Sequence, residues 1–222
     1  EKQRDPGKAK LLQGFFKTGK GEYGEGDIFL GIMVPKSREI ARKYYGLPLT
    51  KVQELLKSKI HEHRLIALLI LVEKFNKSSS QEKANIFNFY LKNTKYINNW
   101  DFVDLSSHKI VGEFLKDKNR EILYKLAQSE NLWEKRISII SCFAYIKDED
   151  FKDALRISGI LLNDKHDLIH KAVGWVLREI GKKDVETLEA FLKKHSKEMP
   201  RTMLRYSIEK FDEEKRKFYM KR

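Results

Sequence analysis

The sequence contains only one cysteine and four prolines among its 222 residues. A single thiol, Cys142, excludes an intrachain disulfide and any metal site that is built from several cysteines. Cys142 stands in the apolar run ISIISCF, so we expect a small buried side chain rather than a nucleophile. The scarcity of proline and of alternating polar and apolar residues favours helices over strands throughout the chain.

Long hydrophobic runs are lacking as well. The longest, from Leu65 to Val72, is far shorter than the about 20 apolar residues that a transmembrane helix requires. The sequence as given opens with charged residues, and we expect no signal peptide in it. These features predict a protein without a membrane-spanning segment.

Acidic residues are fewer than basic ones. The chain has 32 Asp and Glu against 45 Lys and Arg, which gives a formal net charge of +13. Such an excess points to a polyanionic partner, with nucleic acid first and an acidic membrane surface second. A lysine-rich, solvated surface without such a partner is the alternative interpretation.

Marked residues recur at regular intervals along the chain. Arg64 and Trp100 are 36 residues apart, Trp100 and Arg136 are 36 apart, and Arg136 and Lys171 are 35 apart. Periods of this size are typical of helical repeat arrays. Short turns of Asn, Asp, Gly and Lys separate the repeats, and no stretch resembles an interdomain linker. We therefore predict an all-α, HEAT-like helical-repeat solenoid (an α-α superhelix) that forms a single domain over residues 1–222.

Apolar periodicity, capping residues and prolines set the expected helix bounds. Ser37 is expected to cap one helix, Pro48 to open the next, and Ser80 to cap the helix that follows the central one. The expected helices span residues 3–16, 37–45, 49–57, 60–75, 81–91, 99–115, 119–128, 132–146, 149–162, 166–180, 184–195 and 200–210, and a tail follows.

Equivalent positions of successive repeats line one continuous surface in a solenoid. We therefore predict a concave groove that carries Trp100, Asp104, Arg136, Lys171 and Trp175. Trp100 and Asp104 are four residues apart and should share one face of a helix. The alternative is that the tryptophans are ordinary core residues and Asp104 a salt-bridged surface carboxylate. That alternative explains Arg136 and Lys171 poorly, because such residues are seldom fully buried unless paired.

The predicted groove contains one suitably placed acid. A sugar hydrolase that uses two carboxylates would need a second acid at a defined separation, and Asp101 points to another side of the helix. A lone carboxylate among aromatic and cationic side chains suits the electrostatic stabilisation of a positive, oxocarbenium-like centre. Asp104 is therefore the candidate catalytic residue.

The stretch from Lys17 to Asp27 is rich in glycine and is expected to form a flexible, exposed loop. A phosphate-cradling role is excluded, since no preceding strand and no Gly-Lys-Ser/Thr ending are present. The side chains of Lys17, Lys20 and Tyr23 leave open a role in closing over a ligand.

The six histidines do not suggest a metal centre. His61 and His63 are two residues apart, so they diverge on a helix. His166 and His170 are four residues apart, a spacing that zinc can use, but no HExxH pattern occurs. We expect no bound metal.

Four ordered segments resemble the DNA alkylation repair family, the AlkD-like, HEAT-like-repeat alkylpurine DNA glycosylases. Together they cover nearly the whole chain, and any one alone would be a weak signal. The segments are Trp100–Asp104 (WDFVD), Asn131–Arg136 (NLWEKR), Lys171–Glu179 (KAVGWVLRE), and Phe29–Ile32 (FLGI) with Pro35 and Arg38.

The resemblance implies a monofunctional glycosylase of base excision repair that removes positively charged N3- and N7-alkylated purines from duplex DNA by hydrolysing the N-glycosidic bond. Asp104 would be its catalytic carboxylate. Trp100 and Trp175 would pack against the deoxyribose and backbone of the lesion, and Arg136 would contact a phosphate. The other implied DNA-binding residues are Lys171, Arg178, Arg64 and Tyr23.

A cationic alkylpurine leaves as a neutral base, so this reaction requires no general acid and is compatible with one carboxylate. The resemblance further implies no cofactor, no metal and no membrane partner. It implies a cytoplasmic monomer, associated with the nucleoid if the source is prokaryotic, whose partner is double-stranded DNA containing alkylated purines. The alternatives are a non-catalytic HEAT-repeat module that binds branched or damaged DNA, and a scaffold for protein or RNA.

Overall fold

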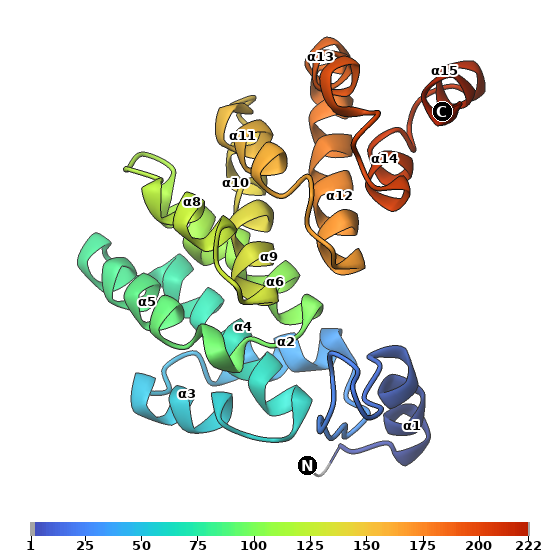
Figure 1. The fold of residues 1–222 in the computed structure, drawn as a ribbon. Coiled ribbons are helices and arrows are strands. Elements are labelled where there is room, and N and C mark those ends of the chain that lie inside the picture. Colours follow the sequence, from blue (N-terminus) through green and yellow to red (C-terminus); the bar gives the residue numbers. More distant parts are fainter. Residues whose placement is uncertain (1–2, 222) are drawn as a thin grey trace. The chain divides into compact units, whose positions relative to one another are not determined.

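The computed structural model describes residues 3–221, and helices dominate its regular structure (Figure 1). No strand occurs among these residues, although Ile28 and Ile60 form an isolated parallel β-bridge. The backbone divides into two compact units, with the division between Phe114 and Leu115. We call them the N-terminal and the C-terminal unit and describe each by itself. The all-α class is confirmed, and the single domain stays a prediction.

The N-terminal unit is built around α4, which packs against α2, α3 and α6. Helix α4 is buried along most of its length, as expected from its apolar sequence. The elements are α1 (Pro6–Phe15), α2 (Val34–Lys43), α3 (Leu49–Leu56), α4 (His61–Lys77), α5 (Ser80–Lys92), a 3-10 helix (Thr94–Tyr96), α6 (Trp100–Ser107), a π-helical turn (His108–Gly112), and α7 (Glu113–Leu115) at the division.

Three expected helix starts can be compared with the structure. Helix α3 begins directly after Pro48, as predicted. Ser37 does not cap α2: it lies buried inside the helix, because Pro35 is compatible with the first turn and the helix begins earlier. Ser79, not Ser80, caps α5. Its hydroxyl accepts the Glu82 N–H at 3.4 Å, and its own N–H donates to the Glu82 carboxylate at 2.8 Å.

The C-terminal unit is built around α12, which packs against α9, α13 and α14. Gly174 permits the close approach of α14, since a Cβ there would lie 2.5 Å from Tyr206 Cβ and 2.6 Å from the Met203 carbonyl oxygen. The elements are α8 (Glu121–Ala127), α9 (Leu132–Ser141), α10 (Phe143–Ile146), α11 (Lys152–Ile160), α12 (Asp167–Lys183), α13 (Val185–His195), α14 (Arg201–Ser207) and α15 (Glu213–Met220).

Helix α15 corrects the expectation of a tail after residue 210. Asp212 caps it by accepting the Lys215 N–H at 2.8 Å, and Tyr219 is buried. The helix was missed because its sequence is mostly charged and shows little apolar periodicity.

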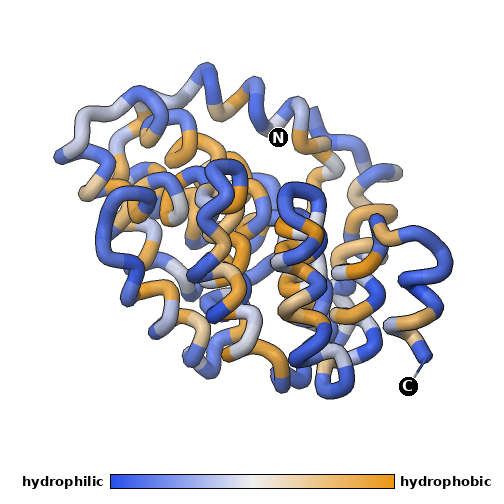
Figure 2. The backbone as a smooth tube through the Cα atoms, turned by 90° about the horizontal axis from the view of Figure 1, so that it is seen from above, coloured by the Kyte–Doolittle hydropathy of each residue, from blue (hydrophilic) through white to orange (hydrophobic). Residues whose placement is uncertain are grey.

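Hydropathy follows the helix faces in each unit. Figure 2 shows hydrophobic residues on the packed sides of the helices and hydrophilic residues along the outer turns. Leu68 and Leu71 of α4 are at most 1% exposed, and Val173 and Leu177 of α12 are fully buried. None of the helices in the described residues is both long and apolar enough to cross a lipid bilayer.

Candidate functional site

Trp100 and Asp104 lie one turn apart on α6, so they occupy the same side of the helix. Asn99 fixes the start of this helix, because its side-chain oxygen accepts the Trp100 N–H at 2.8 Å. Both Trp100 and Asp104 are half-buried, and each therefore retains surface that a ligand can contact.

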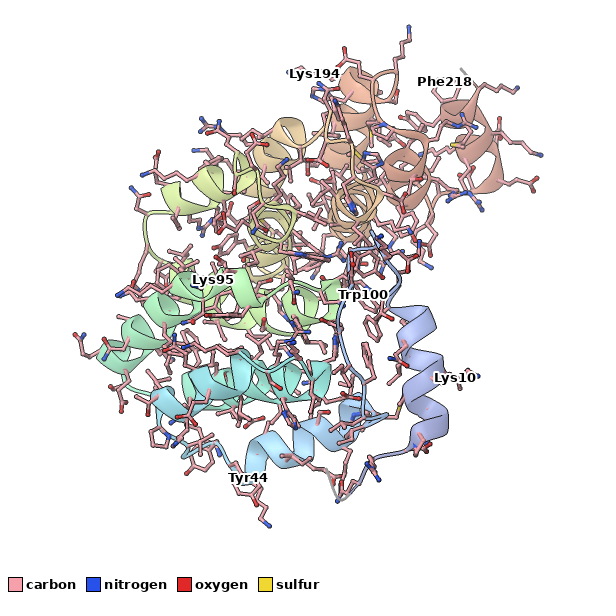
Figure 3. The ribbon with its side chains drawn as sticks, turned by 60° about the horizontal axis from the view of Figure 1, so that its bottom comes forward. Lys10, Tyr44, Lys95, Trp100, Lys194 and Phe218 are labelled. Atoms are coloured by element: carbon pink, nitrogen blue, oxygen red, sulfur yellow. The ribbon has the colours of Figure 1, made fainter. Side chains whose placement is uncertain are left out.

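The indole of Trp100 is held by residues from the beginning of the chain. Phe16 stacks on it with ring centroids 5.0 Å apart, and Phe15 meets it edge-on at 5.8 Å. The indole N–H donates to the Tyr23 hydroxyl at 3.2 Å. Figure 3 shows Trp100 beside this N-terminal segment. The sequence-predicted residues Tyr23, Trp100 and Asp104 are thus brought to one region of the N-terminal unit.

The glycine-rich loop has a defined path that delivers Tyr23 to Trp100. The Gly24 N–H donates to the Lys17 carbonyl at 3.1 Å. A Cβ at Gly24 would lie 2.6 Å from the Phe16 carbonyl oxygen, so only glycine fits this crossing of the chain. Gly24 therefore serves close backbone packing, a use that the sequence alone did not reveal.

A buried histidine lies behind this site. His61, 2% exposed, faces two carboxylates: Nδ1 is 3.0 Å from Asp27 Oδ2 and Nε2 is 2.8 Å from Asp101 Oδ2. Burial disfavours the cation, but the hydrogen bonds to Asp101 and Asp27 outweigh it and raise the pKa of His61 above its usual 6.5. Burial acts against the Asp27 anion too, yet His61 and Arg64 hold the pKa of Asp27 below its usual value.

Arg64 belongs to the same buried network. Its guanidinium pairs with Asp27 at 2.5 Å and donates to the Asn98 side-chain oxygen at 2.8 Å, and the residue is 6% exposed. A guanidinium held inside the protein in this way is poorly placed to reach a phosphate. The prediction of Arg64 as a DNA contact therefore does not fit its position, and we assign it to the internal network.

Glu62 is a third buried charged residue of α4. Its carboxylate accepts the N–H groups of Leu30, Gly31 and Ile32 at distances from 2.8 to 3.1 Å. Gly31 has φ +82°, which an L side chain rarely adopts, and it passes close to the Asp5 backbone. The FLGI segment is thus a backbone receptor for Glu62, which ties the chain entering α2 to α4.

In the C-terminal unit, Lys171, Trp175 and Arg178 follow one another at helical spacing and share one side of α12. Trp175 is half-buried, and its ring lies 4.7 Å from that of Phe143. Lys171 pairs with Asp167 at 2.6 Å, one turn earlier. Arg178 pairs with Glu179 at 3.3 Å and also with Glu209.

Arg136 has a different environment from Lys171 and Arg178. It is 4% exposed, and its guanidinium donates to the Leu168 carbonyl at 2.5 Å, which connects α9 to the first turn of α12. Its predicted phosphate contact is difficult to make from this position.

The predicted site residues are divided between the two units. Trp100 and Asp104 lie in the N-terminal unit, and Arg136, Lys171 and Trp175 lie in the C-terminal unit. That all of them share one concave face stays a prediction.

The remaining polar candidates have structural partners. His166 Nδ1 accepts the Leu168 N–H at 3.1 Å, and His170 Nε2 lies 2.5 Å from the Asp164 carbonyl. Cys142 is buried, and burial raises the pKa of its thiol well above the usual value. Residues 3–221 contain no group of three His, Cys, Asp or Glu side chains arranged to hold a metal ion.

Comparison with known proteins identifies the family. The model of the family described as DNA alkylation repair enzyme matches residues 1–211, so the chain belongs to the DNA alkylation repair enzyme family. A comparison with curated proteins finds no match.

Several solved structures are similar to this chain, among them the following two. A predicted DNA alkylation repair enzyme from Enterococcus faecalis is 16% identical, with a TM-score of 0.71 over 95% of this chain and 98% of that one. AlkD2 from Streptococcus mutans is 17% identical, with a TM-score of 0.60 over 94% and 99%. At these identities the likeness establishes the fold alone, and it confirms the predicted helical-repeat architecture.

Proposed function

We propose that the protein is a monofunctional DNA glycosylase that removes positively charged N3- and N7-alkylated purines from duplex DNA. Membership of the DNA alkylation repair enzyme family supports a role in repairing such damage. The observation that carries the proposal is the arrangement on α6, where Asp104 lies one turn from an indole fixed by Phe16 and Tyr23. Preorganised groups of this kind stabilise charge that develops in a transition state.

In the proposed reaction the bond between C1′ of the deoxyribose and the purine nitrogen breaks, and its electron pair neutralises the cationic base. Asp104 stabilises the positive charge that develops on the sugar and orients the water that attacks C1′. The water forms the new C–O bond and gives its proton to solvent. The attraction between Asp104 and the sugar grows as the bond breaks, and only such differential stabilisation raises the rate.

The remaining predicted residues take supporting roles in this proposal. Trp100 packs against the deoxyribose of the lesion, with Tyr23 beside it, and Trp175 packs against the DNA backbone. Lys171 and Arg178, on one side of α12, contact phosphates, as the net charge of +13 favours. We propose a monomer that acts in the cytoplasm, or at the nucleoid of a prokaryote, without cofactor or metal.

The test is single-turnover release of 7-methylguanine from a methylated duplex by wild type, Asp104→Asn and Asp117→Asn. Asp117 is an exposed aspartate, so its variant controls for the loss of one negative charge. We expect Asp104→Asn to lower the rate about 10²- to 10³-fold and Asp117→Asn to keep it. An unchanged rate for Asp104→Asn would make this carboxylate structural. The protein would then be better described as a non-catalytic module that binds damaged or branched DNA.

A further inference from the structure

We propose that His61, in its protonated form, is a positioning residue that fixes the first turn of α6 and thereby holds Trp100 and Asp104 in place for base excision. This inference deepens the proposed function and rests on it. It begins from the position of the imidazole between Asp27 and Asp101.

Both ring nitrogens of His61 face a carboxylate oxygen. A neutral imidazole carries one N–H and can donate to one of them only, whereas the imidazolium carries two. While both aspartates are ionised, both contacts are therefore hydrogen bonds only when His61 is protonated. In that state the ring connects three separate segments: the loop at Asp27, the first residue of α4, and the second residue of α6.

The connection reaches the backbone next to Trp100. While one oxygen of Asp101 faces His61, the other accepts the Phe102 N–H at 2.9 Å. The imidazole also lies between the rings of Phe29 and Phe102, each with a centroid separation of 4.3 Å. His61 is therefore held on its edges by charge and on its faces by aromatic rings.

The same cluster extends directly to the indole. The ring of Phe16, which stacks on Trp100, also contacts His61 with centroids 4.9 Å apart. Displacement of the imidazole would therefore disturb both the start of α6 and the ring that supports Trp100. Asp104, one turn further along α6, would move with that helix.

Among His61, Arg64, Asp27 and Asp101, which contact one another directly, the charges balance only when His61 is protonated. The charged partners in this network are Asp27, Asp101 and Arg64, and three phenylalanine rings also contact the imidazole. With the imidazolium present, two cations neutralise two carboxylates. Without its proton, the buried network carries one uncompensated negative charge, which is unfavourable away from water. The positioning should weaken as the pH rises.

Excision rates across pH test this role. Single-turnover release of 7-methylguanine is measured from about pH 6 to about pH 9, where a perturbed histidine titrates, for wild type, His61→Gln, Asp101→Asn and His63→Gln. The wild-type rate should fall as His61 loses its proton. Asp101→Asn should move that fall to lower pH, because it removes one carboxylate that favours the cation. His61→Gln should be about 10- to 100-fold slower and should lack this fall.

His63→Gln is the matched control, since His63 lies two residues away on the same helix, half-buried and bonded to Ser58 at 3.1 Å. Its profile should follow the wild type. If His61→Gln fails to fold, the displaced pH profile of Asp101→Asn still tests the role. Identical profiles for wild type, His61→Gln and Asp101→Asn would overturn the proposal.

A second measurement separates this role from the proposed function. The NMR resonance of the Trp100 indole N–H, which donates to Tyr23, is followed over the same pH range without DNA. It should shift in wild type and His63→Gln and stay constant in His61→Gln. If no protein releases any base but the resonance still titrates, the proposed function fails while the positioning of α6 by His61 stands.

An independent observation concerns α15, which lies beyond residue 211, the last residue that the family model matches. The helix is held in the C-terminal unit by an ion pair between Lys215 and Glu189 at 2.6 Å and by the Arg201 guanidinium, which donates to the Met220 carbonyl at 2.8 Å. Next to α13 it borders a half-open cavity of about 530 Å³ that is lined by Lys193, Ser196, Lys197, Phe218, Tyr219 and Lys221.

We infer that this cavity binds single-stranded nucleic acid. Phe218 is 70% exposed on α15 (Figure 3), and an exposed ring offers a face on which a base can stack. None of Lys193, Lys197 and Lys221 forms an ion pair with a described carboxylate, so their charges are available to phosphates. Cations that surround an exposed aromatic ring match the chemistry of a nucleotide strand.

Binding of a short fluorescent oligothymidylate tests this site without reference to base excision. Phe218→Ala should weaken binding about 5- to 10-fold and Phe218→Tyr should retain it, because stacking requires a ring. The double variant Lys193→Gln/Lys197→Gln should weaken binding more than Lys125→Gln/Lys152→Gln, which changes two exposed lysines elsewhere in the unit. Equal losses in the two double variants, or equal competition by polyglutamate, would overturn the site.

Discussion

The two half-buried tryptophans of the predicted site are supported in different ways. Trp100 stacks on Phe16 and donates to Tyr23, which lies 77 residues earlier in the chain. Trp175 lies in the middle of α12 and contacts Phe143 of α10, the helix that follows α9. The position of Trp100 therefore depends on the folding of a distant segment, whereas that of Trp175 follows from the packing of nearby helices.

Phe16→Ala should have the largest effect of the changes that test this difference. Phe16 is 7% exposed and contacts Phe29, His61 and Trp100. Its truncation should cost about 3–5 kcal/mol of unfolding free energy. Phe143→Ala, at a half-buried position, should cost less. Urea denaturation of both variants measures the difference, and equal costs would remove the distinction between the two tryptophans.

Gly174→Ala should destabilise the support of Trp175. The new methyl group would meet Tyr206 and Met203 of α14 at about 2.5 Å, and overpacking of this kind typically costs about 1–3 kcal/mol. Gly159→Ala in α11 is the control. A Cβ there has no neighbour within 4 Å, and alanine favours a helix by about 0.5–1 kcal/mol. The midpoint of thermal denaturation should fall for Gly174→Ala and rise for Gly159→Ala. A higher midpoint for Gly174→Ala would contradict the close packing of α12 and α14.

The buried network predicts a pH dependence of stability in the N-terminal unit. The pKa of His61 is raised, so its contribution is complete below its ordinary value of 6.5 and is lost as the pH rises through the folded-state pKa. The pKa of Asp27 is lowered, so its contribution is lost only as the pH falls below its ordinary value of 3.8. The difference in urea midpoint between wild type and His61→Gln should therefore shrink at alkaline pH. A difference that grows with pH would reverse the assigned sign.

Tyr23→Phe should have the smallest effect. It removes the hydroxyl that accepts the Trp100 indole N–H but keeps the ring, and one such hydrogen bond contributes about 0.5–1.5 kcal/mol. The urea midpoint should fall slightly, and the indole N–H resonance of Trp100 should move toward the position of a solvent-exposed group. No change in that resonance would show that Tyr23 does not hold Trp100 in solution.

Strong local signals made much of the fold predictable. The expected helix at residues 166–180 corresponds to α12 (Asp167–Lys183), where apolar periodicity is clear. The expected helix at residues 60–75 corresponds to α4 (His61–Lys77), which contains the longest apolar run of the chain. Asn99 and Trp100 likewise mark the start of α6. The start of α2 was less predictable, because Ser37 and Pro35 are both compatible with the beginning of a helix and indicate different first residues.

The site was less predictable, because its contacts join distant parts of the sequence. Arg64 was expected at the surface, since arginine is rarely buried unless paired. Its partners are Asp27 and Asn98, and the latter lies 34 residues away. The one available signal was local: His61, Glu62 and Arg64 directly precede the apolar run from Leu65 to Val72, where charged side chains must find partners.

The attachment of Glu62 to the FLGI segment has a consequence for any shortened form of the chain. A protein that began at α2 would leave Glu62 without the three N–H groups that it binds and would leave His61 and Arg64 without Asp27. These charges would then draw water into the interior of the helix array. A separate peptide carrying the missing segment should bind such a truncated protein and restore its structure, as in fragment complementation. The segment from Asp27 to Ile32 thus acts as an internal ligand of α4.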